Sequence, residues 1–183
     1  MINTVGTTAF QWHVKPWVVK LDESEMRMGE IVGNIRRDFA LRNKIKAADN
    51  APEDERARTI DILGTLGEIA SAKALNMHWQ PAMVYDAAQI DVGGSFEIRT
   101  TDNPYGNLIM KKKDRDYLPY ILVIAKPPYF KLVGWMMGSD AKSDQYWDVG
   151  KAAGGKLRVP NWLVPSVKLK GMDEISLLRV SND

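Results

Sequence analysis

Cysteine is absent from this chain of 183 residues, and histidine occurs only at His13 and His78. Disulfide bonds and thiolate zinc sites are therefore excluded, and a metal site rich in histidine is not expected. Long hydrophobic runs are also missing, because the longest strongly apolar stretch, residues 121–125, is far too short to cross a bilayer. The first residues lack the pattern of a secretory signal. We therefore expect a cytoplasmic protein that does not act at a membrane.

A large excess of one charge is missing as well, since the net charge is only +2. This balance does not by itself indicate a nucleic-acid-binding protein, although local clusters can still form a basic surface. The apolar share of 45% and the charged share of 26% are ordinary for a soluble globular protein. The length suits one domain with a proper core, so we expect residues 1–183 to form a single domain.

The first regular pattern predicts a helix over residues 22–47, which Asp22 or Ser24 can cap. Apolar residues at helical spacing predict its buried stripe: Met28, Ile31, Val32, Ile35, Phe39 and Ile45. The opposite face carries a set of basic residues: Arg36, Arg37, Arg42, Lys44 and Lys46. Two interpretations of Arg36 and Arg37 stay open, because such cations form either a solvated helix face or a patch that contacts DNA.

A second helix is predicted over about residues 53–76. The small residues Gly64, Gly67 and Ser71 lie on one side of it and predict very close packing against a sheet. Glu68 falls inside this packed stripe. A glutamate is costly to bury unless it is paired, protonated or bound to a metal ion, so Glu68 is a candidate functional residue. A buried salt bridge to an arginine, for example Arg99, is the ordinary alternative.

Short strands follow the two helices. The predicted strands and apolar pieces are an extended lead-in over 1–20, then 83–85, 89–92, 95–101, 108–112, 120–125, 129–137, 162–164 and 175–180, with a surface loop at 140–160. The strand at 120–125 is the most apolar and is expected to be central, with 129–137 as its antiparallel neighbour. This order predicts an α+β fold, or α/β in looser classifications, with a mixed central β-sheet flanked by helices.

The strands on either side of the Gly93-Gly94 turn carry the most informative pattern in the chain. In a hairpin closed there, Val92 faces Phe96 and Asp91 faces Glu97, so both carboxylates share one face. Like charges directly opposite each other destabilise a hairpin, and a cation between them removes the repulsion. Carboxylate oxygens suit Mg²⁺ or Mn²⁺.

Glu68, Asp91 and the triplet Glu97-Ile98-Arg99 follow one another in an order that resembles the PD-(D/E)XK nuclease superfamily. This superfamily includes many restriction enzymes, Holliday-junction resolvases and phage exonucleases. Residues 64–70 look like its first-helix motif, Ile90-Asp91 stands where the family has Pro-Asp, and the triplet stands where it has (Asp/Glu)-x-Lys. The later strands are similar in layout to phage-type members.

The resemblance implies a restriction-endonuclease-like core over about residues 53–138, with the helix at 22–47 and the segment 139–183 packed on it. It also implies divalent-metal-dependent hydrolysis of DNA phosphodiester bonds. Asp91, Glu97 and the carbonyl of Ile98 would bind Mg²⁺ or Mn²⁺, and Glu68 would complete the shell directly or through a water molecule. Dimers are common among relatives that cut both strands, so a homodimer is a further expectation.

Arg99 departs from the family pattern, because it stands where the family has lysine. An arginine stays protonated at any working pH, so Arg99 cannot act as a general base, although it can position water or phosphate. Lys111, Lys112 or Lys113 is an alternative source of the lysine, and the same three residues are candidate contacts to DNA phosphates or an ordinary solvated strand end.

Two further readings of the whole chain stay open. The substitution at Arg99 is compatible with a catalytically inactive nuclease-fold protein that binds DNA without cutting it. The small net charge is compatible with an accessory binding module that has no role with nucleic acid. Trp147 and Tyr146, in a polar segment, are candidates for stacking on bases, with core or edge cover as the ordinary alternative.

Overall fold

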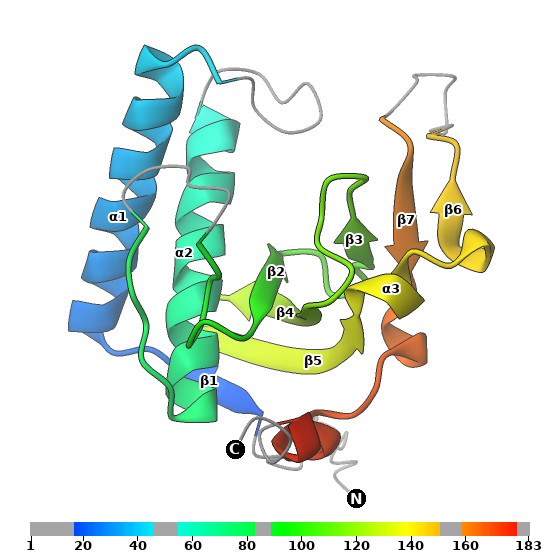
Figure 1. The fold of residues 1–183 in the computed structure, drawn as a ribbon. Helices are drawn as coiled ribbons and strands as arrows, with labels where there is room; N and C mark the ends of the chain where they lie inside the picture. The colour runs from blue at the N-terminus through cyan, green and yellow to red at the C-terminus, as the bar shows by residue number, and fades with distance from the viewer. Residues whose placement is uncertain (1–16, 46–54, 83–88, 151–158, 179–183) are drawn as a thin grey trace, which may run out of the picture.

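The computed structural model describes residues 17–45, 55–82, 89–150 and 159–178 (Figure 1). Two long helices, α1 (Glu23–Arg42) and α2 (Glu55–Leu75), lie side by side. Helix α2 packs against all four strands of a mixed sheet, and α1 packs on α2. A small antiparallel sheet lies at the right of the view in Figure 1, away from the two long helices. The predicted α+β class with a mixed sheet is therefore confirmed.

The mixed sheet has the strand order β1-β5-β4-β2. Its strands are β1 (Val18–Lys20), β2 (Glu97–Thr101), β4 (Pro119–Lys126) and β5 (Tyr129–Met137). Strands β2 and β4 are parallel, whereas β5 is antiparallel to both of its neighbours. The expected central strand and its antiparallel neighbour are confirmed, and the end of the extended N-terminal lead-in forms the edge strand β1.

The small sheet has the order β3-β7-β6, with β3 (Leu108–Met110), β6 (Trp147–Asp148) and β7 (Asn161–Val164). A short helix, α3 (Gly138–Ala141), and three 3₁₀ helices complete the described elements; the latter are Asp144–Tyr146, Ser166–Lys168 and Met172–Leu178. Strand β3 is shorter than predicted and pairs outside the mixed sheet. The predicted strand at 83–85 lies outside the described residues.

Helix α1 begins with a reciprocal cap, in which the Asp22 carboxylate accepts from the amide of Glu25 at 2.9 Å and the Glu25 carboxylate accepts from the amide of Asp22 at 2.7 Å. The predicted buried stripe of this helix is wrong, because Met28, Ile31 and Ile35 are exposed. Of the predicted stripe Val32 is buried, and the rest of the buried set is different: Gly29, Gly33, Arg37 and Ala40.

Glycine explains this rotation of α1. A Cβ atom on Gly33 would lie 2.6 Å from the Cα atom of Ile62, so the two helices meet at backbone distance along this line. A Cβ on Gly29 would likewise meet the side chain of Leu66 at 2.3 Å. The closest approach of two helices requires small residues on the contact line, and this requirement outweighs the apolar spacing that the sequence displays.

Helix α2 approaches β2 equally closely. A Cβ atom on Gly67 would lie 1.9 Å from the Thr100 hydroxyl oxygen, which confirms the predicted close packing at this position. Gly64 has no atom within 4 Å of such a Cβ, so the prediction is wrong there. Glu68 is the next residue of α2, the helix that packs on the strand carrying Glu97 and Arg99.

The predicted hairpin forms only at its turn. Val92 and Phe96 pair in an isolated antiparallel bridge, as expected, and Gly93 and Gly94 have φ values of +56° and +65° that favour glycine. Residues 89–91 form no strand, because the carboxylate of Asp91 takes the Ile98 amide that a neighbouring strand would have used. No helix among the described residues is long and apolar enough to span a membrane.

The two glycines of α2 give a matched test of this packing. We expect Gly67→Ala to lower the free energy of unfolding by about 1–3 kcal/mol, because the added methyl group must displace Thr100. We expect Gly64→Ala to leave stability unchanged or raise it by about 0.5–1 kcal/mol, since alanine favours helix and the space is open. Urea unfolding measures both, and equal effects of the two substitutions would contradict the close contact.

Candidate functional site

Asp91 is fixed directly beside Glu97 by a backbone contact. The carboxylate of Asp91 accepts a hydrogen bond from the amide of Ile98 at 2.8 Å, and Ile98 is the residue after Glu97 on β2. The two left-handed glycines, Gly93 and Gly94, reverse the chain so that Asp91 comes back against the start of the strand. The two carboxylates that the sequence singled out are therefore brought together.

Glu97 is a buried carboxylate, only 8% exposed, at the start of β2. Its oxygens contact two arginines: Arg115 donates to one at 2.8 Å, and Arg99 lies 3.6 Å from the other. Burial and the charge of Asp91 raise the pKa of Glu97 to about 7, and they outweigh the opposing effect of the two arginines. Glu97 thus changes its protonation state near neutral pH.

Glu68 lies on α2 and is only 6% exposed. Both of its oxygens accept from the guanidinium of Arg36 on α1, at 2.6 and 2.8 Å, and the indole of Trp79 donates to one of them at 3.1 Å. Burial raises the pKa of Glu68, the charge of Asp91 adds to this effect, and Arg36 opposes it. Glu68 is therefore paired with an arginine, and that arginine is Arg36 rather than Arg99.

Arg99 lies between several negative groups. Its guanidinium contacts Asp114 at 3.0 Å and donates to the carbonyl of Ile98 at 3.2 Å, and it stacks over the ring of Tyr120 at 5.0 Å. Burial works to lower the pKa of Arg99, but the charges of Asp114, Asp91 and Glu97 outweigh it, so the pKa is raised. Arg99 therefore stays a cation and cannot accept a proton.

Sequence reasoning gave Asp114 and Tyr120 no part in the site, and it considered Arg115, with the three lysines, only as a phosphate contact or a solvated strand end. Asp114 and Arg115 lie on the loop between β3 and β4, where Asp114 holds Arg99 and Arg115 holds Glu97. The phenol of Tyr120 accepts from the amide of Arg115 at 2.8 Å. Burial, followed by the charges of Asp114 and Glu97, raises the pKa of Tyr120 to about 12. Their only signal in the sequence is the run of alternating charges before the central strand, which does not reveal what it contacts.

The expected exposed patch at Arg36 and Arg37 is wrong. Arg36 is engaged by Glu68 and by the carbonyl of Ala82, and Arg37 is only 3% exposed. The reason is the rotation of α1, which brings Arg36 against Glu68 of α2 and buries Arg37. The three lysines lie elsewhere: Lys111 is half-buried, and Lys112 and Lys113 are exposed on the loop that carries Asp114 and Arg115.

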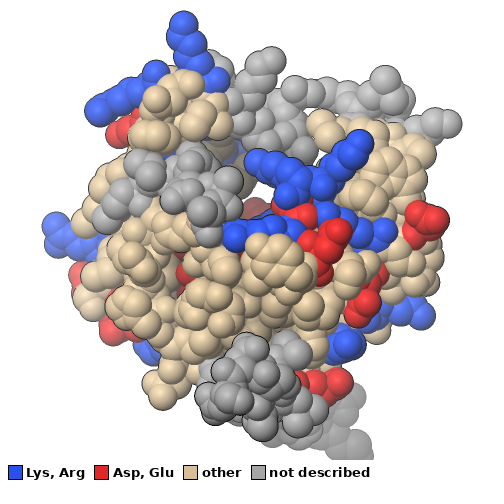
Figure 2. Space-filling view, viewed as in Figure 1, with Lys and Arg blue, Asp and Glu red and all other residues tan. Residues whose placement is uncertain are grey.

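Asp91 links the three candidate acids electrostatically, since its charge raises the pKa of both Glu68 and Glu97. The acids do not form a preassembled cluster, however. Among the described residues, no three histidine, aspartate or glutamate side chains lie close enough to hold one metal ion. Figure 2 shows basic side chains gathered at the centre of one face, with acidic side chains immediately beside them.

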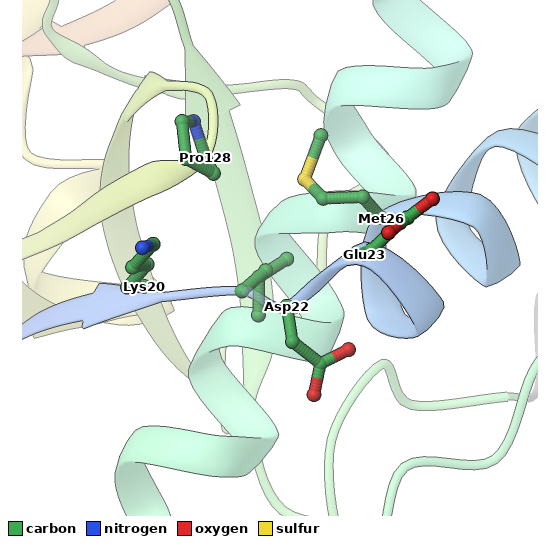
Figure 3. A pocket seen from close by; sticks show the side chains of 6 residues that line it. Lys20, Asp22, Glu23, Met26 and Pro128 are labelled. Atoms are coloured by element: carbon green, nitrogen blue, oxygen red, sulfur yellow. The ribbon is translucent and has the colours of Figure 1, made fainter.

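A separate pocket lies at the junction of β1 and α1 (Figure 3). It is lined by Lys20, Leu21, Asp22, Glu23, Met26 and Pro128. Lys20 pairs with Tyr129, at the end of the mixed sheet away from Glu97, so the pocket is distinct from the acidic site. Of its two carboxylates, that of Asp22 is occupied as the helix cap.

Comparisons of the chain with protein-family models, with curated proteins and with solved structures gave no match.

The raised pKa of Glu97 predicts a pH-dependent stability. The folded protein holds this proton up to about pH 7, whereas an unfolded glutamate releases it near its ordinary pKa of 4.5. The folded state therefore binds more protons between these values, so the contribution of Glu97 to stability falls as the pH rises from 4.5 to about 7 and then stays constant. We expect the stability difference between Glu97→Gln and the unmodified protein to grow by roughly 1–2 kcal/mol from pH 5 to pH 8. Urea unfolding across this range measures it, and a constant difference would contradict the shift.

The pair of Arg36 and Glu68 predicts non-additive mutational effects. We expect Arg36→Leu to destabilise the fold by about 3–5 kcal/mol, because it leaves a buried carboxylate without its partner. We expect the double variant with Glu68→Leu to be markedly more stable than Arg36→Leu alone. The exposed pair of Arg58 and Asp38 is the control, since Asp38→Asn should cost at most about 1 kcal/mol. Additive effects in the double-mutant cycle would contradict the coupling.

Proposed function

We propose that the protein is a divalent-metal-dependent nuclease that hydrolyses DNA phosphodiester bonds on a restriction-endonuclease-like core. The observation that carries this proposal is the state of Glu97. Its carboxylate is buried, lies beside Asp91 and has a pKa raised to about 7. Perturbed carboxylates of this kind occur where a site is arranged for chemistry or for a cation.

The donor set fits a hard divalent ion. Asp91, Glu97 and the carbonyl of Ile98 would hold Mg²⁺ or Mn²⁺, which both prefer oxygen ligands and need fewer than three carboxylates when water and phosphate complete the shell. When bound, such an ion supplies an acidified water molecule and charge stabilisation on the phosphate. Both oxygens of Glu68 are bonded to Arg36, which favours a contribution of Glu68 through a water molecule.

The residues of the chain have defined parts in the hydrolysis. Arg99 donates hydrogen bonds to the phosphate and stabilises the extra negative charge of the transition state. The oxygen of the attacking water bonds to phosphorus, and the bond from phosphorus to the leaving sugar oxygen breaks. The proton of the attacking water passes to solvent, since Arg99 holds its own protons, and the leaving oxygen takes a proton from water.

One observation favours a second candidate, a catalytically inactive nuclease-fold protein that binds DNA. The guanidinium of Arg99 contacts Glu97, the carbonyl of Ile98 and Asp114, so a cation of the protein itself already balances the acids. In this reading Arg99 replaces the metal ion, and the site is a structural remnant. The two candidates differ in what divalent ions do to DNA in the presence of the protein.

We expect the protein to cut DNA in Mg²⁺ or Mn²⁺ and not in EDTA. Linear, nicked, branched and circular substrates, resolved on gels, measure the activity. Asp91→Asn and Glu97→Gln should lower the cleavage rate at least about 100-fold, because each removes a ligand of the ion. Asp102→Asn, at an exposed carboxylate in the turn after β2, is the control and should cut normally.

A protein that leaves every substrate intact but binds DNA with unchanged affinity in EDTA would favour the inactive candidate. A variant Asp91→Asn that cuts at the normal rate would refute the assignment of this residue. Circular dichroism and urea unfolding of each variant exclude misfolding as the cause of a lost activity.

A further inference from the structure

The loop between β3 and β4, residues 111–118, is anchored to the acidic site by two ion pairs and is closed by an internal hydrogen bond. Asp114 accepts from the amide of Lys111 at 2.8 Å and from Arg99 at 3.0 Å. Arg115 donates to Glu97 at 2.8 Å. The loop is thus a fixed wall of the site rather than a separate surface feature.

A buried lysine holds the outer side of the same loop. The ammonium group of Lys142, on a side chain that is 14% exposed, donates to the carbonyls of Lys112 and Asp114 and pairs with Asp116 at 2.6 Å. These contacts use two backbone carbonyls and the carboxylate of Asp116, so they do not engage the side chains of Lys112, Lys113 and Tyr117.

Two cations and one aromatic ring lie exposed on this anchored loop. Lys112 and Lys113 are exposed, and Tyr117 is 69% exposed. The hydroxyl of Tyr117 accepts a hydrogen bond from the guanidinium of Arg115, which in turn contacts Glu97. Arg115 therefore links the exposed ring of Tyr117 to Glu97, the carboxylate whose pKa is raised.

A second exposed ring adjoins the other end of the loop. Trp147, 43% exposed, packs edge-on against Trp162 with ring centroids 4.6 Å apart. The ammonium group of Lys142 lies 5.9 Å above the centre of the Trp162 ring and donates to the carbonyl of Lys112. Trp147, on β6, is therefore linked through Trp162 and Lys142 to the backbone of the loop at Lys112.

We propose that the surface formed by Lys112, Lys113 and Tyr117 of this loop, together with Trp147 of β6, binds an unpaired DNA strand and leads it to the acidic site. Aromatic rings bind nucleic acid by stacking on base faces, and those faces are accessible only where the bases are unpaired. The lysines contact the phosphates of the same strand. The proposal rests on the proposed function for the cleavage of that strand, and it narrows the substrate to DNA with a single-stranded segment.

Binding in EDTA tests this surface without cleavage. Fluorescence anisotropy with labelled oligonucleotides compares a single strand, a duplex with a single-stranded overhang and a blunt duplex of equal length. We expect the single strand and the overhang to bind at least about 10-fold more tightly than the blunt duplex, since stacking contributes strongly for each free base. Tyr117→Ala should weaken single-strand binding roughly 5- to 150-fold.

Matched variants separate stacking from other effects. Tyr117→Phe keeps the ring but loses the hydroxyl contact to Arg115, and it should bind the single strand as the unmodified protein does. Tyr129→Ala removes an exposed tyrosine at the other end of the mixed sheet and should also have no effect. Lys113→Ala should reduce the slope of log affinity against log salt by about 0.7, the value for one phosphate on a single strand.

Equal affinity for the blunt duplex and the single strand, or unchanged single-strand binding by Tyr117→Ala, would overturn this inference. If one of these binding results were obtained and the protein still cut blunt duplex, only the binding surface would be refuted and the proposed nuclease activity would be supported. Selective single-strand binding that depends on Tyr117, combined with no cleavage in Mg²⁺ or Mn²⁺, would overturn the nuclease and leave the binding surface standing.

Discussion

The structure depends on pairing carboxylates that the fold has removed from water. A buried carboxylate without a partner costs several kcal/mol, so each one here requires a cation from another segment. Glu68 on α2 takes Arg36 from α1, Glu97 on β2 takes Arg115 from the β3–β4 loop, and Arg99 on β2 takes Asp114 from that same loop. The first pair joins α1 to α2, and the other two pairs join the β3–β4 loop to β2. Because each pair spans two elements, the position of one element fixes the charge environment of the next.

Elements defined by a strong local pattern could be predicted from the sequence. The run of apolar residues in β4, the turn at Gly93-Gly94 and the two long helices each have a signal contained in a few neighbouring residues. The face that α1 buries could not be predicted in the same way. Its apolar spacing favoured Met28, Ile31 and Ile35, but the contact with α2 is set by Gly29 and Gly33, whose importance appears only once a second helix is placed against them. Small residues indicate that another segment packs closely against them, but they do not identify that segment.

The same difference between local signals and tertiary contacts applies to the residues of the candidate site. Glu68, Asp91 and Glu97 could be selected because burial of a glutamate and facing of two carboxylates are local consequences of helix and turn geometry. Their partners could not, because Arg36, Asp114 and Arg115 come from segments whose distance in the fold is set by tertiary packing. Arg36 was expected on an exposed face, solvated or in contact with DNA, for that reason, although it makes the bidentate contact that neutralises Glu68.

The charge balance of the site limits what it can bind. Four carboxylates, Glu68, Asp91, Glu97 and Asp114, face three guanidinium groups, those of Arg36, Arg99 and Arg115, so no positive charge is left over for a phosphate. Partial protonation of Glu97 near pH 7 brings the site close to neutral but still provides no attraction. A phosphate could enter only with an added cation or beside the lysines of the β3–β4 loop. In the nuclease that we propose, the same shortage of positive charge would favour a divalent ion at Asp91 and Glu97, and the lysines of the proposed binding surface would be the first contact of an incoming strand.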